Sequence, residues 1–376
     1  MQTRNLTFFV ANFHIFFFMS TNFLRNKSLW IVLLLIVAFI FPYLKDMLPE
    51  RSPASNSSTI EKPTKPAVTV NVPTFNADSA YYFVEKQVSF GPRVPGTPAH
   101  KKCAAWISGE FKRFGMTVIE QKFTAQTYFG DRDAVNIIAQ YKPELVNRVL
   151  LCAHWDSRHV ADKDTKNQNS AIDGADDGAS GVGVLLEIAR QLQANSVEMG
   201  VDLICFDAED LGDDRPHDNV TSVMTQANPE KQARTWCLGS QHWARNLHKP
   251  GYSARFGILL DMVGAKGAVF PREGYSAQNA PQVQDRIWNI AAELGFGASF
   301  PNRDGGGVTD DHVFVMAGTR IPTVDIISIP NEPPKSFGAY HHTHDDNMSI
   351  IDPKTLGMVG TVVTTVVYRE GAGAFL

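Results

Sequence analysis

The feature that most constrains the fold is the recurrence of short apolar runs with helical segments between them. Several of these runs are nearly continuous in hydrophobic residues, which is typical of strands buried on both faces of a sheet. The predicted strands are residues 117–123, 134–141, 148–153, 201–206, 256–262 and 322–329. Amphipathic spacing predicts helices at residues 77–90, 99–114, 180–193, 281–294 and 353–368. Strands alternating with helices predict an α/β fold, a single domain with a mixed, mostly parallel central sheet flanked by helices.

Composition excludes some classes of protein and leaves the cysteines undecided. With 44% hydrophobic and 20% charged residues among 376, the chain has ordinary globular composition. The formal net charge of −4 and the lack of a basic stripe argue against a nucleic-acid partner. Cys152 and Cys205 lie inside predicted strands, where buried free thiols are expected. A disulfide between them stays open, because sequence does not show connectivity.

The N-terminal part has the pattern of a targeting segment. Residues 29–44 are apolar and follow Arg25 and Lys27, which is typical of a signal sequence or signal anchor. No clear cleavage site follows, which favours a retained anchor, and whether translation starts at Met1 or Met19 stays open. The predicted parts are an N-terminal hydrophobic signal/anchor region at 1–45, a flexible linker at 46–75 and a catalytic domain at 76–376. We expect the catalytic domain to lie outside the cytoplasm.

Acidic residues and histidines gather in segments where a predicted strand ends or a loop begins. The segments are His154-Trp155-Asp156-Ser157, Gly174-Ala175-Asp176-Asp177-Gly178, Phe206-Asp207-Ala208-Glu209-Asp210 and His341-His342-Thr343-His344-Asp345-Asp346-Asn347. In open α/β sheets, ligands bind outside the carboxyl ends of the strands. A catalytic zinc takes three protein ligands, such as carboxylates and imidazoles, and keeps one position open. The four segments together therefore predict a zinc site.

The acids in these segments allow more than one interpretation. Asp176 and Asp177 precede a predicted helix, so Asp176 is the candidate helix cap and Asp177 the candidate ligand. Glu209 and Asp210 are adjacent, and neighbouring acids repel each other unless a cation or a proton lies between them. A metal on one and a transferable proton on the other would explain both. Asp310 is either a buried acid or, as the residues alone favour, part of a helix cap.

The histidine cluster is the remaining source of a nitrogen ligand. His341, His342 and His344 lie within four positions and are followed by Asp345 and Asp346. A neutral imidazole oriented by a neighbouring carboxylate is the usual arrangement at zinc. The spacing does not say which histidine would bind.

From about residue 80 to residue 370 the chain resembles the animal-type (type II) glutaminyl-peptide cyclotransferases, whose fold is that of the zinc aminopeptidases. The resemblance rests on Phe90-Gly91-Pro92-Arg93-Val94-Pro95-Gly96, on residues 153–157, 206–210 and 259–265, on Asp310-Asp311-His312, and on residues 342–347. No disulfide matching the animal enzymes is evident, which suggests a bacterial relative. Two departures stand out. Glu209-Asp210 replaces a Glu-Glu pair, and the long segment 211–236 differs.

The resemblance implies a role for each site residue. It implies one Zn2+ per chain held by Asp177, Asp210 and His342, with Glu209 as the general acid/base. Asp261 and Asp310 match acids that share hydrogen bonds with that base. Trp236 and Phe337 match aromatic walls of the substrate pocket.

The expected reaction converts an N-terminal glutamine of peptides and proteins to pyroglutamate and releases ammonia. The expected partners are such substrates and, through the N-terminal hydrophobic segment, a membrane. The expected location is the bacterial periplasm, either anchored or released after signal cleavage. The main alternative is a dinuclear zinc aminopeptidase with His154 and Asp261 as extra ligands and Asp177 as the bridge. A receptor-like domain without activity is disfavoured by the intact ligand set and Glu209.

Overall fold

The computed structural model describes residues 70–213, 235–330 and 337–375, all within the unit that spans Val68–Leu376. The predicted signal/anchor region lies outside the described residues, and so does the predicted linker up to residue 69. Phe75 is buried and Val70 and Val72 pack against the core, so ordered contacts reach back to residue 70. No helix in the described ranges is long and apolar enough to cross a membrane.

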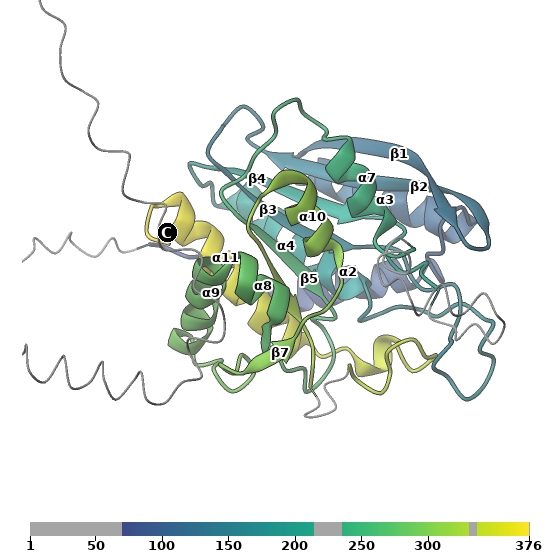
Figure 1. Cartoon of the computed structure of the whole chain (residues 1–376). Coiled ribbons are helices and arrows are strands. Elements are labelled where there is room, and N and C mark those ends of the chain that lie inside the picture. Colours follow the sequence, from purple (N-terminus) through teal and green to yellow (C-terminus); the bar gives the residue numbers. More distant parts are fainter. Residues whose placement is uncertain (1–69, 214–234, 331–336, 376) are drawn as a thin grey trace, which may run out of the picture. The chain divides into compact units, whose positions relative to one another are not determined.

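A six-stranded sheet forms the centre of this unit, in the order β1-β2-β4-β3-β5-β8 (Figure 1). Its strands are β1 Thr117–Thr127, β2 Gly130–Tyr141, β3 Arg148–His154, β4 Gly200–Phe206, β5 Gly257–Asp261 and β8 Thr323–Ile327. β1 and β2 form an antiparallel hairpin, and β2 also pairs antiparallel with β4. β4, β3, β5 and β8 are mutually parallel. The prediction of a mixed, mostly parallel sheet is confirmed.

The inner strands are apolar on both faces, and helices cover each face of the sheet. One face packs against α2 Ala77–Val88, α3 Pro98–Arg113, α4 Ala179–Ala194, α9 Pro281–Glu293 and α11 Pro353–Gly371. The other packs against α7 Leu238–Arg245 and α10 Asp311–Thr319 (Figure 1). Successive residues of β3 alternate between the faces, with Leu151 in the first cluster and Leu150 in the second.

The shorter elements were not predicted as such, since each offers too few turns for periodicity. They are β6 Arg272–Glu273, α8 Gly274–Asn279, β7 Asp304–Gly306 and η2 Met348–Ile350. α7 was also missed. The helices that were predicted all form, with ends within a few residues of the expected ones.

The cysteines are free and buried, as expected. Cys152 lies on β3 and Cys205 on the neighbouring β4, where their partners in the ladder are Ile204 and Ala153. This offset of one residue sends the two thiols to opposite faces of the sheet, as their separate core clusters show. A Cys152–Cys205 disulfide is therefore excluded.

Candidate functional site

The carboxyl ends of the parallel strands open into a cavity of about 850 Å³. His154 is the last residue of β3 and Asp261 the last of β5, while Glu209 and Asp210 follow β4. All eight residues of the predicted site line this cavity, namely Asp177, Glu209, Asp210, Trp236, Asp261, Asp310, Phe337 and His342. Segments that are far apart in sequence thus meet at one edge of the sheet, as the strand order requires.

The turn before α4 gives its two aspartates different tasks. The expectation that Asp176 caps the helix is wrong, because Gly178 is the cap residue and no side chain caps it. Asp176 instead reaches across to the end of β5, where its carboxylate accepts from the Gly264 N–H at 2.7 Å. It also accepts from the Tyr340 hydroxyl at 2.6 Å. These bonds fix the turn, so that Asp177 faces the cavity as predicted.

The adjacent acids after β4 are held through their main chain. Asp156 accepts the N–H of Glu209 at 3.1 Å and that of Asp210 at 3.2 Å, one on each carboxylate oxygen. Ala208, just before them, has a left-handed φ of 55°. Left-handed backbone at a non-glycine residue is sparsely populated and gathers at functional sites. This arrangement lets both acids line one cavity although they are neighbours.

His342 lies between the two candidate ligand carboxylates. Its Nε2 is 3.3 Å from Asp210 Oδ1 and 3.8 Å from Asp177 Oδ2. Its Nδ1 is 3.4 Å from Asp162 Oδ1. A carboxylate facing the second ring nitrogen is the usual way to orient a metal-binding histidine.

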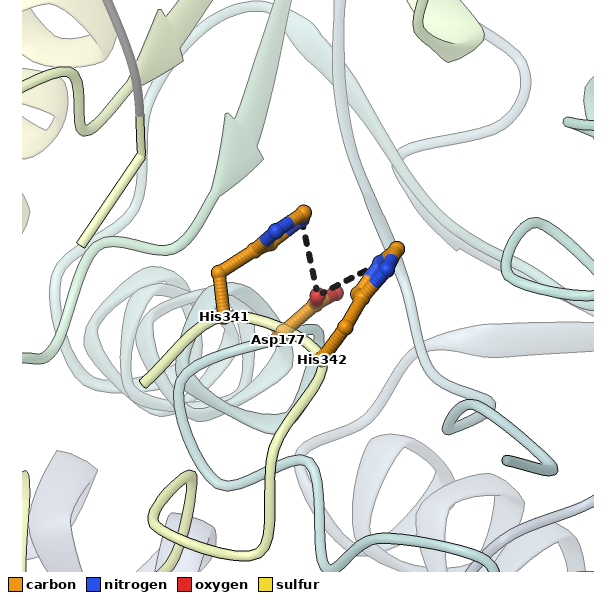
Figure 2. A group of neighbouring side chains, drawn as sticks. All are labelled: Asp177, His341 and His342. Atoms are coloured by element: carbon orange, nitrogen blue, oxygen red, sulfur yellow. Dashed lines mark ion pairs between the residues drawn. The ribbon is translucent and has the colours of Figure 1, made fainter. Parts of the chain in front are cut away.

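His341 lies as close to Asp177 as His342 does, at 3.8 Å (Figure 2). Its Nδ1, however, is 2.8 Å from the Lys163 ammonium, which can only donate. Burial and the charge of His342 hold the pKa of His341 well below its usual range, so the ring is neutral. A neutral ring that accepts at Nδ1 carries its proton on Nε2, the nitrogen that faces Asp177. The surroundings of the two rings thus differ, because Lys163 faces Nδ1 of His341 whereas Asp162 faces Nδ1 of His342. Asp177, His341 and His342 all offer ligand atoms within 4.8 Å of one another.

The donor set of Asp177, Asp210 and His342 fits a zinc-type dication. Two carboxylates and one imidazole are typical zinc ligands. Asp210 Oδ2 is buried and has no hydrogen-bond partner. The contacts of 3.3 and 3.8 Å from His342 Nε2 are close to the roughly 3.3 Å that separates tetrahedral ligands at zinc bond lengths.

A second cluster adjoins the first and shares Asp177. His154 Nε2 is 3.0 Å from Asp177 Oδ1 and 3.2 Å from Asp261 Oδ1. Although burial opposes it, hydrogen bonds with Asp156, Asp177 and Asp261 raise the pKa of His154 well above its usual value. A Cβ at residue 178 would lie 2.4 Å from this imidazole, so only glycine leaves room for the ring. These are the residues that the aminopeptidase alternative requires.

Glu209 and Asp310 form the acidic side of the cavity. Their carboxylates and the Cys237 thiol offer atoms within 4.8 Å of one another, and Cys237 Sγ donates to Glu209 Oε1 at 3.1 Å. Burial, with the charges of Asp310 and Asp210, raises the pKa of Glu209 well above its usual value. Burial and the charge of Asp261 raise the pKa of Asp310 to about 7. Asp310 also accepts from the Asp311 N–H as the cap of α10, so it is both a cap and a buried acid.

Aromatic rings line the cavity where the resemblance placed them. The Trp236 ring lies parallel to that of His342, with centroids 5.9 Å apart and an interplanar angle of 9°. The Arg158 guanidinium lies over Trp236 at 4.6 Å. Phe337 contacts the His341 ring at a centroid distance of 4.5 Å. Both predicted wall residues therefore border the predicted ligand histidine or its neighbour.

Several supporting residues were not predicted. Asp156 and Asp346 lie within the motifs, but nothing in their spacing separates a supporting carboxylate from a ligand. Asp346 accepts the N–H of Asp176 at 2.7 Å. Asp162 and Lys163 lie in a loop without a pattern, so no sequence signal could have found them.

Comparison with known proteins places the chain in a family. Residues 136–367 match the sequence pattern of peptidase family M28, and the chain belongs to this family. The glutaminyl-peptide cyclotransferase of Bos taurus is 26% identical over 302 residues, covering 73% of this chain and 77% of the relative.

Solved structures of bacterial proteins are more similar in sequence, and two of them illustrate this. The glutaminyl cyclase of Tannerella forsythia is 49% identical, with a TM-score of 0.73, over 79% of this chain and 99% of that structure. A Zn-dependent exopeptidase from Parabacteroides distasonis is 46% identical, with a TM-score of 0.74, over 80% of this chain and 100% of that structure. The resemblance inferred from the motifs and the predicted fold are both confirmed.

Proposed function

We propose that this protein is a zinc-dependent glutaminyl-peptide cyclotransferase, which converts N-terminal glutamine to pyroglutamate and releases ammonia. The main support for this proposal is one cavity that Asp177, Asp210, His342, Glu209 and Asp310 all line, with His342 Nε2 at 3.3 Å from Asp210 and 3.8 Å from Asp177. Membership of the M28 family and the similarity to bacterial glutaminyl cyclases support it.

Asp177, Asp210 and His342 would hold one zinc ion per chain, with Asp162 orienting the imidazole. When bound, the zinc would supply Lewis-acid polarisation of the glutamine side-chain carbonyl. Asp210 replaces a glutamate of the animal enzymes and is one methylene shorter. Arg158 lies 3.3 Å from Asp210 Oδ1, so this carboxylate is held by a buried cation as well.

Glu209 would transfer the proton. The substrate's α-amino nitrogen attacks the side-chain amide carbon, and the new C–N bond closes the five-membered ring. Glu209 accepts the proton of the attacking amine and then donates it to the departing nitrogen, which leaves as ammonia. The reaction neither consumes nor releases a water molecule.

Asp310 and Asp261 would steady the charge that develops near Glu209. Each is buried at the cavity, and Asp261 is held by His154 at 3.2 Å. Trp236 and Phe337 narrow the cavity, which favours a curled glutamine side chain close to its own amine. Holding the amine close to the side-chain amide carbon lowers the entropic part of the barrier to ring closure.

A dinuclear aminopeptidase is the second candidate, and the cluster of His154, Asp177 and Asp261 favours it. Their ligand atoms lie within 4.8 Å of one another and next to the first donor set. In that reaction a water would attack the peptide carbonyl between two metals.

The deciding experiment gives the purified full chain a Gln-initiated and a Leu-initiated peptide, with products identified by mass spectrometry and bound metal quantified. Loss of ammonia from the Gln peptide alone, with about one zinc per chain, is the expected result. Release of free leucine with about two metals per chain would overturn the proposal in favour of the aminopeptidase. Removal of metal by a chelator should abolish the cyclisation, and added zinc should restore it.

We also propose that the catalytic domain acts in the periplasm, tethered through residues 29–44. The support is the pattern of a positive flank followed by an apolar run in the sequence. Cell fractionation of a bacterial host that expresses the full chain should place it in the membrane fraction. Deletion of residues 1–45 should leave it in the cytoplasm.

A further inference from the structure

The cavity is acidic at its base and carries a cation at its mouth. The carboxylates at the base are buried, among them Asp177, Asp210 and Asp310. The mouth is formed by exposed residues, including Lys163, Gly307 and Thr309. Among the described residues that line the cavity, Lys163 is the one lysine or arginine.

Contacts on both sides of Lys163 hold it next to the histidine turn. Its main-chain N–H donates to the carbonyl of His342 at 3.3 Å. Asp162 faces His342 Nδ1 at 3.4 Å, and Asp164 accepts the N–H of His344 at 2.9 Å. The segment 162–164 is therefore fastened along the turn that carries the candidate zinc ligand.

The Lys163 ammonium lies one imidazole ring away from the reacting centre. Its Nζ is 2.8 Å from His341 Nδ1, and the Nε2 of that ring is 3.8 Å from Asp177 Oδ2. The ring of Phe337 lies 6.0 Å below the ammonium. The charge thus has a defined position relative to the glutamine that the base of the cavity would hold.

The mouth that Lys163 borders is the way out of the cavity for the rest of a bound peptide. With the glutamine side chain at the donor set, the rest of the peptide leaves through the mouth, because the base is closed by buried residues. Successive Cα atoms are only about 3.8 Å apart, so we expect the second residue of the peptide to lie at the mouth that Lys163 helps to form. We propose that Lys163 is a specificity-determining residue that favours substrates with Asp or Glu directly after the glutamine and disfavours Lys or Arg there. This inference rests on the proposed cyclotransferase function.

The size of the preference follows from the exposure of Lys163. Ion pairs between solvent-exposed groups change an equilibrium by up to about fivefold, and like charges act by a similar factor in the opposite direction. We therefore expect kcat/KM for a Gln-Glu peptide to exceed that for a Gln-Lys peptide by about tenfold, with Gln-Ala in between. Salt at about 1 M shortens the Debye length to about 3 Å and should remove most of this difference.

The test measures kcat/KM of the full chain on amidated Gln-Glu, Gln-Ala and Gln-Lys peptides, which differ only in the second side chain. Lys163→Met should bring the three values within about twofold, and Lys163→Glu should reverse their order. Lys166→Met is the matched control, because Lys166 is an exposed lysine in the same loop that does not line the cavity. It should leave the order unchanged.

Each other outcome has a definite meaning. A wild-type enzyme that cyclises the three peptides equally well, at low salt, overturns the inference whatever the variants do. Equal losses on all peptides in Lys163→Met overturn it too, since Lys163 would then act on the site as a whole, for example through His341, and not on the second side chain of the peptide. If no Gln peptide is cyclised by the zinc-loaded wild type, the proposed function fails instead.

Discussion

Glu273 is the residue whose replacement should most directly loosen the wall of the cavity. Its side chain is buried at the end of β6 and caps α8, where it accepts the Ser276 N–H at 2.7 Å. It also accepts the Val308 N–H at 2.9 Å and contacts His312 Nε2 at 3.1 Å. One carboxylate therefore joins α8, the glycine-rich segment that lines the cavity, and α10, whose cap is Asp310.

Glu273→Ala removes the acceptor and leaves these donors buried without a partner. Each unsatisfied buried donor costs about 1–3 kcal/mol. Because the Ser276, Val308 and His312 contacts share one side chain, the losses do not simply add, and we expect about 4 kcal/mol in total. Glu273→Gln keeps the shape and one acceptor, so about half of that loss is expected.

Urea unfolding followed by circular dichroism measures the difference. With a slope of about 3 kcal/mol/M, Glu273→Ala should lower the midpoint by about 1.3 M. Glu85→Ala, on the exposed side of α2, is the control and should change stability by less than about 0.5 kcal/mol. A midpoint shift below about 0.3 M in Glu273→Ala, at unchanged slope, would refute the role given to this carboxylate.

The dependence of stability on pH tests the Glu273–His312 contact independently. Burial raises the pKa of Glu273, but the ion pair with His312 and the bonds from Ser276 outweigh it and lower the pKa to about 2. The stabilisation is thus present above the unfolded pKa of about 4.3 and is lost as the pH falls through about 2. The wild type should lose about 3 kcal/mol over this window that Glu273→Gln does not lose. Parallel acid titrations of the two proteins would contradict the argument.

Three further replacements test other parts of the structure. Glu209→Gln should lower the rate of cyclisation at least about 100-fold while zinc stays bound. Full activity in this variant would contradict the proton-transfer role of Glu209. Asp162→Asn should weaken zinc binding by about 10- to 100-fold in a chelator competition, because it leaves His342 without its facing carboxylate; unchanged affinity would count against that role. Tyr252→Phe removes the 2.7 Å bond to the buried Asp202 and should destabilise the fold by about 1–2 kcal/mol in urea, whereas an unchanged midpoint would mean that the bond contributes nothing.

Much of the fold was predictable because the long elements have strong periodicity. The inner strands are buried throughout, and β3, β4, β5 and β8 appear in the sequence as apolar runs. The short pieces β6, α8 and β7 were not predicted, although Glu273 and the glycine segment beside the cavity belong to them. Their form depends on tertiary contacts such as that of Glu273 with Val308.

The predicted site residues converge, but their individual tasks depend on geometry. Asp176 and Asp177 are adjacent and chemically identical, and only the contacts with Gly264 and Tyr340 separate the supporting acid from the cavity acid. His341 and His342 differ through Lys163, which lies 178 positions earlier than His341 and in a loop without a pattern. The domain boundaries and the periplasmic location stay predictions.

The close packing of α4 on β5 has a consequence for how the protein binds a metal ion. At Gly181 a Cβ would lie 2.3 Å from the Leu260 carbonyl oxygen, so helix and strand touch through their backbones. This contact fixes the turn that carries Asp177 against the end of β5. Asp156 holds the main chain of Asp210, and the Lys163 N–H donates to the carbonyl of His342, so the other two candidate ligands are also held by contacts within the protein. Little conformational entropy therefore remains to be lost when an ion binds. The protein should load its metal after folding rather than need the metal in order to fold, which is the opposite of a zinc finger.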